Sequence, residues 1–169
     1  DRSLEDPAEG WYIRANLFKY HAACYLTHAG IEVARMLRAR PGVSPDRIAA
    51  ITLRVDESTD RVCNIAAPVT GLEAKFSHRL TAAMALAGLE TSRLDTFSEA
   101  VATDPMVVAL RDKVSIDLVP GFGQTHAAMD IRLVDQTTLS ADHDAGIPAE
   151  NVAHQGIRIR AKFDGLVAP

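Results

Sequence analysis

The chain has 169 residues, 47% of them hydrophobic and 24% charged, and its 18 basic and 22 acidic residues leave a formal net charge of -4. This composition is that of an ordinary globular domain, and the length is sufficient for a hydrophobic core. No apolar run approaches the roughly 18 residues that span a bilayer, and the basic residues are scattered. Composition therefore argues against a membrane protein and against a nucleic-acid-binding protein.

The first elements are predicted from residue spacing. Residues 1–15 are polar and interrupted by Pro7 and Gly10, so we expect a connector there. Apolar residues at helical spacing predict a helix from Thr27 that ends before Pro41. Strict alternation of apolar and polar residues then predicts a half-buried strand over 51–56.

The middle of the chain is predicted to be helical. After a loop at 64–71, Thr70 and Glu73 have the spacing of a capping box, which predicts one continuous helix that ends at Gly88. Two shorter helices follow, one capped by Thr91 through about residue 100 and one capped by Asp104 through about residue 112.

In the remainder of the chain, apolar and polar residues alternate as they do in strands. Strands are predicted over 114–118 and 129–133, and a short fourth strand around Leu139. Residues 143–155 are polar and predict an exposed loop, and 157–167 could form a strand or begin a helix. Because no strand is apolar on both faces, a doubly wound parallel sheet is disfavoured. The pattern predicts an α+β two-layer sandwich, with a mostly antiparallel sheet of about four strands covered by helices.

Reactive side chains are densest between Lys19 and His28, where Cys24 and Thr27 also lie. This segment precedes the first predicted helix, so it combines cationic groups with the positive end of a helix dipole and would suit a carboxylate or a phosphate. The alternative is that Thr27 only caps the helix, that Cys24 is a small buried hydrophobe, and that the histidines are structural or surface residues.

Lys75 is a second candidate, because the predicted helix places it in a first turn where its charge opposes the dipole and favours a nearby anion. The alternative is an exposed lysine paired with Glu73. A basic stripe of Arg158, Arg160 and Lys162 is interpreted as solvated surface. The two cysteines lack any Cys-x-x-Cys spacing and the histidines lack the spacing of metal ligands, so no metal site is predicted and a reducing, cytoplasmic setting is expected.

Four segments of the chain form a recognisable combination. They are Phe18-Lys19 with Cys24 and Thr27-His28, then Val62-Cys63-Asn64-Ile65, then Gly71-Leu72-Glu73-Ala74-Lys75-Phe76-Ser77, and finally Asp104-Pro105 with Val107. Together they resemble the MmgE/PrpD family, whose named members include 2-methylcitrate dehydratase, cis-aconitate decarboxylase and an iminodisuccinate epimerase. The resemblance extends over most of residues 11–135.

The resemblance implies a domain organisation. Family members have a large helical domain built from both ends of the chain and an inserted α+β lid, so this chain is expected to be a piece of a longer protein. It would comprise a connector from the missing helical domain (1–15), the lid (16–145), and a loop and return segment toward that domain (146–169). The expected partners are that helical domain, a small polycarboxylate substrate and a second copy in a homodimer.

The resemblance also implies chemistry without a metal or cofactor, in which a proton next to a carboxylate is removed and water or CO2 is lost or the proton returns. Lys19 matches a family active-site lysine, with Cys24, Thr27, His28 and Lys75 binding substrate or shaping the pocket. Relatives have prolines after the lysine, where this chain has Tyr-His-Ala, which leaves the loop geometry open.

A dehydratase is favoured over an epimerase or a decarboxylase, since decarboxylases carry histidine in place of Cys24. The isolated chain is expected to be inactive, because the remaining catalytic groups would lie in the helical domain. The hypothesis from another class is an independent, non-catalytic α+β module for ligand binding or dimerisation.

Overall fold

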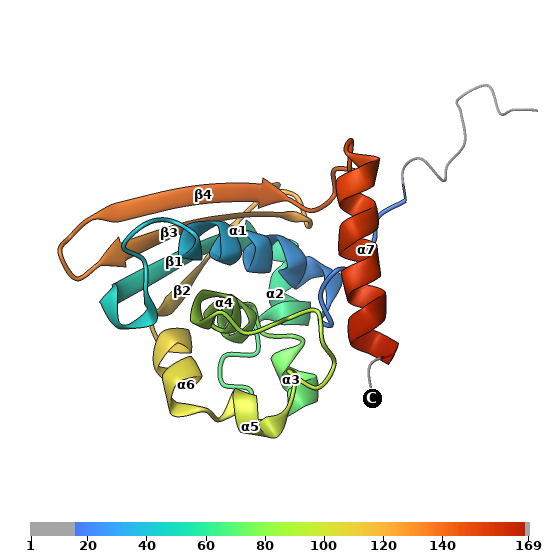
Figure 1. Ribbon diagram of the computed structural model, residues 1–169. Coiled ribbons are helices and arrows are strands. Elements are labelled where there is room, and N and C mark those ends of the chain that lie inside the picture. Colours follow the sequence, from blue (N-terminus) through green and yellow to red (C-terminus); the bar gives the residue numbers. More distant parts are fainter. Residues whose placement is uncertain (1–15, 168–169) are drawn as a thin grey trace, which may run out of the picture.

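The computed structural model describes residues 16–167, and it consists of a four-stranded sheet packed on a layer of helices (Figure 1). The expected connector at 1–15 lies outside the described residues. The strand order is β2-β1-β3-β4, with β1 parallel to β2 and antiparallel to β3, and β3 antiparallel to β4. The strands are β1 (Ile48–Asp56), β2 (Val114–Val119), β3 (His126–Leu133) and β4 (Thr138–Asp144). The predicted α+β class is confirmed.

The register places the apolar residues of neighbouring strands side by side. Leu53 of β1 lies opposite Ile116 of β2 and Met129 of β3. Because alternate residues point to opposite faces of a strand, the polar Arg54 and Asp130 fall on the other face, where they form an ion pair of 2.7 Å. One face of the sheet is therefore apolar and the other polar, as the alternation predicts.

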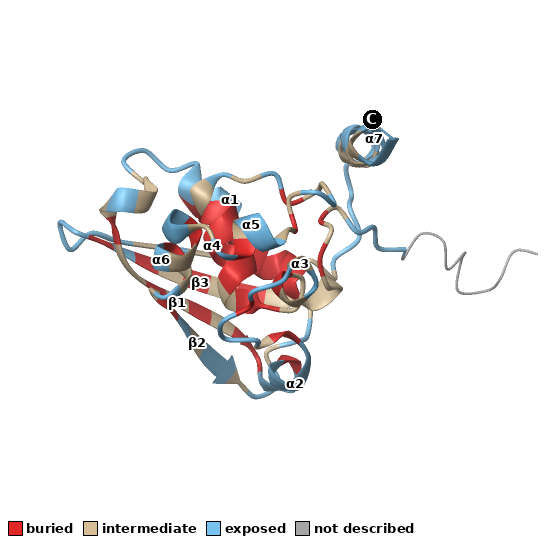
Figure 2. Ribbon diagram, turned by 90° about the horizontal axis from the view of Figure 1, so that it is seen from below, coloured by how far each residue is buried: buried red, intermediate tan, exposed pale blue. Residues whose placement is uncertain are grey.

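Helices α1 (His28–Arg38) and α4 (His78–Ala87) cover the apolar face. Figure 2 shows that buried residues are concentrated in these two helices and in the strands above them. Helix α6 (Pro105–Arg111) packs against α4. The largest fully buried side chains of the core include Ile31, Leu37, Ile51, Leu53, Leu80, Met84, Met129 and Ile131.

The single helix predicted from Thr70 to Gly88 is wrong, because the chain breaks between α3 (Gly71–Ala74) and α4. The capping box at the start of α3 is present as predicted. Ser77, however, begins a new helix: its hydroxyl accepts a hydrogen bond from the Leu80 amide at 3.2 Å and donates one to the Ile65 carbonyl at 2.6 Å. Pairing with the preceding loop thus interrupts a segment whose local pattern is helical.

The helix predicted to start at Thr91 is also wrong. Residues 91–98 form turns, and the short helix α5 (Glu99–Ala102) is capped by Ser98 instead. Thr91 is fully buried and its hydroxyl pairs with the His21 ring, which explains why it does not serve as a cap. The cap at Asp104 is confirmed, since its carboxylate accepts hydrogen bonds from the amides of Met106 and Val107.

The C-terminal part differs from the predicted loop at 143–155. The residues up to Asp144 belong to β4, and α7 (Val152–Val167) begins before the expected loop ends. Residues 157–167, for which the sequence left a strand or a helix open, are helical. Helix α7 contains no fully buried residue, and it lies at the side of the two layers (Figures 1 and 2). A short helix, α2 (Asp60–Cys63), was not predicted.

Candidate functional site

Four segments that are distant in sequence meet around a pocket of about 530 Å³, which we call the lysine pocket. It contains Lys19 and Cys24 from the first segment, Lys75 from the α3–α4 junction, and Lys162 from α7. Its other lining residues are His21, Ala22, Ala23, Tyr25, Leu72, Phe76, Leu94 and Leu166. The structure therefore brings together three of the five predicted site residues and adds a third lysine.

Backbone hydrogen bonds hold the first segment in place. The Cys24 amide donates to the Lys75 carbonyl at 3.0 Å, and the Ala22 amide donates to the Thr91 carbonyl at 2.8 Å. These bonds take the place of the backbone hydrogen bonds that a helix or a strand would make. They hold the irregular segment against the α3–α4 junction and against the turn at Thr91. Lys19 and Lys75 consequently lie on segments that the Cys24–Lys75 backbone bond joins directly.

Lys75 does not occupy the position that the sequence predicted. It is the C-cap residue of α3 rather than a first-turn residue of a long helix, so the helix dipole favours its charge. The dipole argument for an anion near Lys75 is therefore wrong, because the helix end favours the lysine charge without one. Its ammonium nitrogen lies 5.9 Å from the centre of the Phe97 ring. Since no ion pair joins it to Glu73, whose carboxylate closes the capping box, the alternative of a Lys75–Glu73 pair is also unsupported in the described structure.

Lys162 is the site residue that the sequence interpretation missed. Its ammonium group donates a hydrogen bond to the Ser92 carbonyl. Burial lowers the pKa of Lys162, and the positive charges of Lys19 and Lys75 lower it further, whereas Glu90 acts in the opposite direction. Among the described residues that line the pocket there is no aspartate or glutamate. The pocket is therefore a concentration of positive charge in a chain of net negative charge.

The basic stripe on α7 is thus divided between two environments. Arg158 and Lys162, four residues apart, face the domain, as expected for residues that share one side of a helix. Arg160 points away, with 77% of its side chain exposed and only Asp164 as a partner at 3.6 Å. The interpretation of this stripe as solvated surface is confirmed for Arg160 and wrong for Arg158 and Lys162.

Thr27 and His28 do not line the lysine pocket. The Thr27 hydroxyl is buried and donates to the Cys24 carbonyl at 2.8 Å, so Thr27 supports the segment without making the side-chain cap of α1. His28 instead lines a second cavity of about 170 Å³ together with Tyr20, Tyr25 and Arg158. Tyr25 borders both cavities, and its hydroxyl donates to the Ala145 carbonyl at 2.6 Å.

The His28 ring is neutral at physiological pH. Burial, followed by the charges of His21 and Lys19, lowers its pKa to about 3. Its Nε2 atom is buried and has no hydrogen-bond partner within the described part of the chain. A neutral imidazole with a free nitrogen can accept a proton or a hydrogen bond.

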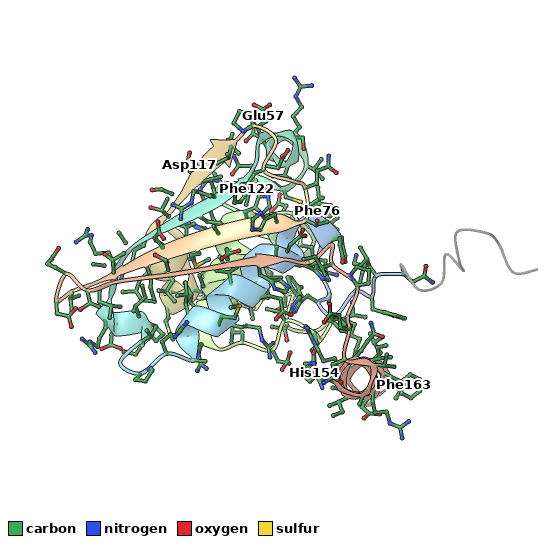
Figure 3. All side chains as sticks on the ribbon, turned by 90° about the horizontal axis from the view of Figure 1, so that it is seen from above. Glu57, Phe76, Asp117, Phe122, His154 and Phe163 are labelled. Carbon is green, nitrogen blue, oxygen red and sulfur yellow. The ribbon has the colours of Figure 1, made fainter. Side chains whose placement is uncertain are left out.

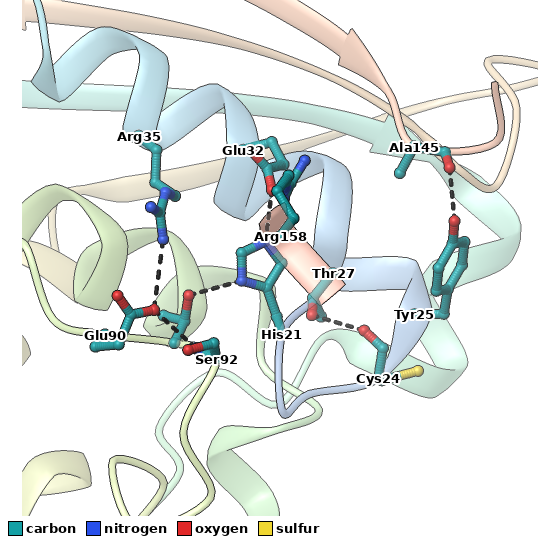
Figure 4. Close-up of polar contacts among 11 residues, drawn as sticks. His21, Cys24, Tyr25, Thr27, Glu32, Arg35, Glu90, Ser92, Ala145 and Arg158 are labelled. Carbon is teal, nitrogen blue, oxygen red and sulfur yellow. Dashed lines mark hydrogen bonds and ion pairs between the residues drawn. The ribbon is translucent and has the colours of Figure 1, made fainter. Parts of the chain in front are cut away.

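His21 lies at the centre of a polar network (Figure 4). Its Nε2 contacts the Glu32 carboxylate at 2.8 Å and its Nδ1 contacts the Thr91 hydroxyl at 2.8 Å. A carboxylate can only accept, so Nε2 carries the proton, and burial lowers the pKa of His21, which leaves Nδ1 free to accept from Thr91. Glu32 also accepts from Arg158, which stacks 3.8 Å from the centre of the Tyr20 ring.

This network has a clear electrostatic consequence for Glu32. Burial alone would raise its pKa, but the hydrogen bonds and charges of His21 and Arg158 outweigh burial and hold the pKa at about 2. The network therefore connects α1, the Lys19 segment and α7 around one ionised carboxylate. Sequence spacing contains no signal for it, because its members are distant along the chain.

Within residues 16–167 no group of three or more potential metal-ligating side chains lies together, and no helix is long and apolar enough to cross a membrane. Figure 3 shows the side chains in place, including Phe76 of the lysine pocket and Phe163 on α7.

Comparison with known proteins identifies the class of this domain. Residues 21–169 match the family model described as MmgE/PrpD C-terminal domain. Since the match covers most of the chain, the protein belongs to the MmgE/PrpD family of enzymes, and the chain spans its C-terminal domain. A search of the curated proteins finds no match.

Proposed function

We propose that this chain is the substrate-binding part of a metal-independent enzyme that acts on a small di- or tricarboxylate, and that the enzyme is a dehydratase. The observation that carries this proposal is the convergence of Lys19, Lys75 and Lys162 on one pocket without acidic lining residues. Ammonium groups bind carboxylates through charge-assisted hydrogen bonds, and a partly apolar pocket strengthens them. Family membership supports the same class of chemistry.

The proposed reaction begins with removal of a proton from the carbon next to a substrate carboxylate. Negative charge then accumulates on that carboxylate, and positive groups placed beforehand stabilise it. In a dehydration, the new double bond forms as the neighbouring C–O bond breaks, and the departing hydroxyl takes a proton to leave as water. Lys19 acts either as the acid–base group or as the charge clamp, and Lys75 binds a second carboxylate.

The other predicted site residues, Cys24, Thr27 and His28, have supporting roles in the proposed site. Cys24 lines the pocket together with Lys19 and Lys75, so it contributes to the shape of the pocket wall. Thr27 holds the Cys24 carbonyl. His28 offers a neutral nitrogen on the opposite side of the Tyr25 ring. A decarboxylase is disfavoured by the Cys24 position, and an epimerase shares the same first step.

The remaining parts of the proposal concern the rest of the protein. We propose that a helical domain of the same chain closes the lysine pocket and supplies further catalytic groups, so that the described domain is inactive by itself. We also propose that the enzyme is a homodimer and that it is located in the cytoplasm.

The test uses the complete gene product and a panel of di- and tricarboxylates. Absorbance of an unsaturated product detects dehydration or decarboxylation, and exchange of solvent deuterium into recovered substrate detects an epimerase. We expect Lys19→Gln to lower kcat by about a hundredfold or more with an unchanged circular dichroism spectrum. Arg160→Gln is the matched control, because it removes one exposed positive charge from α7.

Two results would count against the proposal. Full activity of Lys19→Gln would remove Lys19 from the reaction. Binding of carboxylates without turnover or deuterium exchange would instead support the non-catalytic ligand-binding module.

A further inference from the structure

Lys162 lines the lysine pocket from a different element than the two lysines that the sequence had singled out. Lys19 belongs to the N-terminal segment and Lys75 to the α3–α4 junction, whereas Lys162 enters from α7. The three ammonium groups are close enough for Lys19 and Lys75 each to affect the charge of Lys162. A ligand that touches all three therefore contacts three separate elements of the fold.

The hydrogen bond of Lys162 holds its ammonium group in place without using its full donor capacity. The Ser92 carbonyl accepts one of the three N–H donors, and two remain for a ligand. Glu90 is the one acidic group found to act on Lys162, and its carboxylate is already engaged by the Ser92 amide at 3.1 Å and by Arg35 at 3.6 Å. Within residues 16–167, consequently, no carboxylate neutralises the charge of Lys162 in an ion pair.

The side of α7 that carries Arg158 and Lys162 makes the contacts that position the helix. Arg158 contacts Glu32 and stacks on Tyr20, and Lys162 contacts Ser92 one turn later. Since no residue of α7 is fully buried, these polar contacts position the helix relative to the pocket. Arg158 therefore positions Lys162, and Lys162 faces the pocket.

We infer that Lys162 binds a third carboxylate of the substrate and thereby distinguishes tricarboxylates from dicarboxylates. This inference rests on the proposed function, in which Lys19 and Lys75 bind the other two carboxylates. A dicarboxylate can occupy those two lysines and leave Lys162 beside the Ser92 carbonyl, so loss of Lys162 costs it little. A tricarboxylate loses a charge-assisted hydrogen bond when Lys162 is removed.

The test compares two ligands that differ by one carboxylate. Tricarballylate and glutarate share the same carbon chain, and glutarate lacks the central carboxylate. Isothermal titration calorimetry on the complete gene product, at one fixed ionic strength, measures Kd for each ligand with the wild type, Lys162→Gln and Arg160→Gln. Arg160→Gln makes a neutralising change to a cation on the same helix, outside the pocket.

We expect Lys162→Gln to raise the Kd of tricarballylate about tenfold or more and that of glutarate less than about threefold. Arg160→Gln should change both by less than about twofold, and Lys162→Arg should restore most of the tricarballylate affinity. An equal loss for both ligands, or no loss for either, overturns the inference. Those outcomes leave the proposed function intact if Lys19→Gln still abolishes turnover, whereas a wild type that binds neither ligand overturns both.

Discussion

The backbone amide of Cys24 donates a hydrogen bond of 3.0 Å to the backbone carbonyl of Lys75. This bond joins two segments that are distant in the sequence, and both residues line the lysine pocket. It also uses the carbonyl at the end of α3, a group that a helix end leaves without an internal partner. The site is therefore assembled by the irregular junction between two helices.

The position of Cys24 predicts that carboxylates protect it from alkylation. Cys24 lines the lysine pocket and is partly exposed, whereas Cys63 is fully buried and burial raises the pKa of its thiol. Iodoacetamide should modify Cys24 and leave Cys63 intact in the folded protein. Citrate at ten times its Kd should slow the reaction about tenfold, because only the free site reacts.

Mass spectrometry of the complete gene product measures this protection at each cysteine. Acetate at the same ionic strength is the control, since one carboxylate cannot bridge the lysines. If citrate binds by calorimetry and yet leaves the alkylation rate of Cys24 unchanged, the ligand occupies another place.

The buried histidines predict a loss of stability in mild acid. Burial lowers the pKa of His28 to about 3 and that of His78 to about 4, each from an ordinary value of 6.5. Between pH 6.5 and 4 the unfolded chain binds protons at both rings and the folded chain does not, so stability falls as pH falls. Each ring should remove roughly 2 kcal/mol of the free energy of unfolding by pH 5.

Urea unfolding at pH 7 and pH 5 measures this effect. His78→Gln should be less stable at pH 7, because it disturbs the contact with Thr59 at 3.0 Å, but should lose roughly 2 kcal/mol less between the two pH values. His154→Asn, at an exposed position, is the control and should keep the wild-type slope. If His78→Gln and the wild type lose the same free energy of unfolding between pH 7 and pH 5, the lowered pKa of His78 does not cause the loss.

Ser77 predicts an unusually costly loss of a helix cap. Its hydroxyl caps α4 and also donates to the Ile65 carbonyl, and the residue is fully buried. Ser77→Ala should therefore lower the free energy of unfolding by about 2 kcal/mol, because it removes a helix cap and a second hydrogen bond made by the same hydroxyl. Ser98→Ala, which removes the cap of α5 alone, should cost about 1 kcal/mol or less. Equal losses in chemical denaturation would show that the Ile65 bond contributes nothing.

Gly71 and Gly156 predict opposite effects of the same substitution. A Cβ atom on Gly71 would lie 2.1 Å from the Phe97 carbonyl oxygen, so Gly71→Ala forces the backbone of α3 away. We expect a loss of about 1–3 kcal/mol and weaker citrate binding, because Lys75 moves with α3. Gly156 lies within α7 with open space around it, and Gly156→Ala should stabilise that helix by roughly 0.5–1 kcal/mol.

Thermal unfolding measures the Gly71→Ala effect, and hydrogen exchange of the α7 amides measures the Gly156→Ala effect, since a peripheral helix opens locally. Slower exchange confined to α7 is the expected result. Faster exchange of the α7 amides in Gly156→Ala would contradict the open space around Gly156. An unchanged melting temperature for Gly71→Ala would contradict the close contact between Gly71 and the Phe97 carbonyl.

Much of the fold could be predicted because its causes are local. The alternation in β1, the capping box of Thr70 and Glu73, and the cap at Asp104 depend on neighbours within a few residues, and each is present in the structure. The parallel pairing of β2 with β1 has no local signature, because it depends on where the intervening helices return the chain.

Two of the incorrect predictions have the same physical reason. Ser77 and Thr91 carry local signals for a continuing helix and for a cap, but a partner outside the predicted helix, the Ile65 carbonyl or the His21 ring, offers a competing hydrogen bond. Helical propensity is worth a fraction of a kcal/mol per residue, which is less than the cost of a buried unpaired polar group.

The sequence by itself determined the α+β class, the apolar face of the sheet and the helix caps at Thr70 and Asp104, whereas the expectation of several cationic groups between Lys19 and His28 was wrong for the buried histidines. Only the tertiary structure decided that Lys75 and Lys162 join Lys19, while His28 faces a second cavity. The reason is that composition and periodicity report on neighbours along the chain. A binding site depends on which side chains the packed elements bring together, and here that is set by the α3–α4 junction and the contacts of α7.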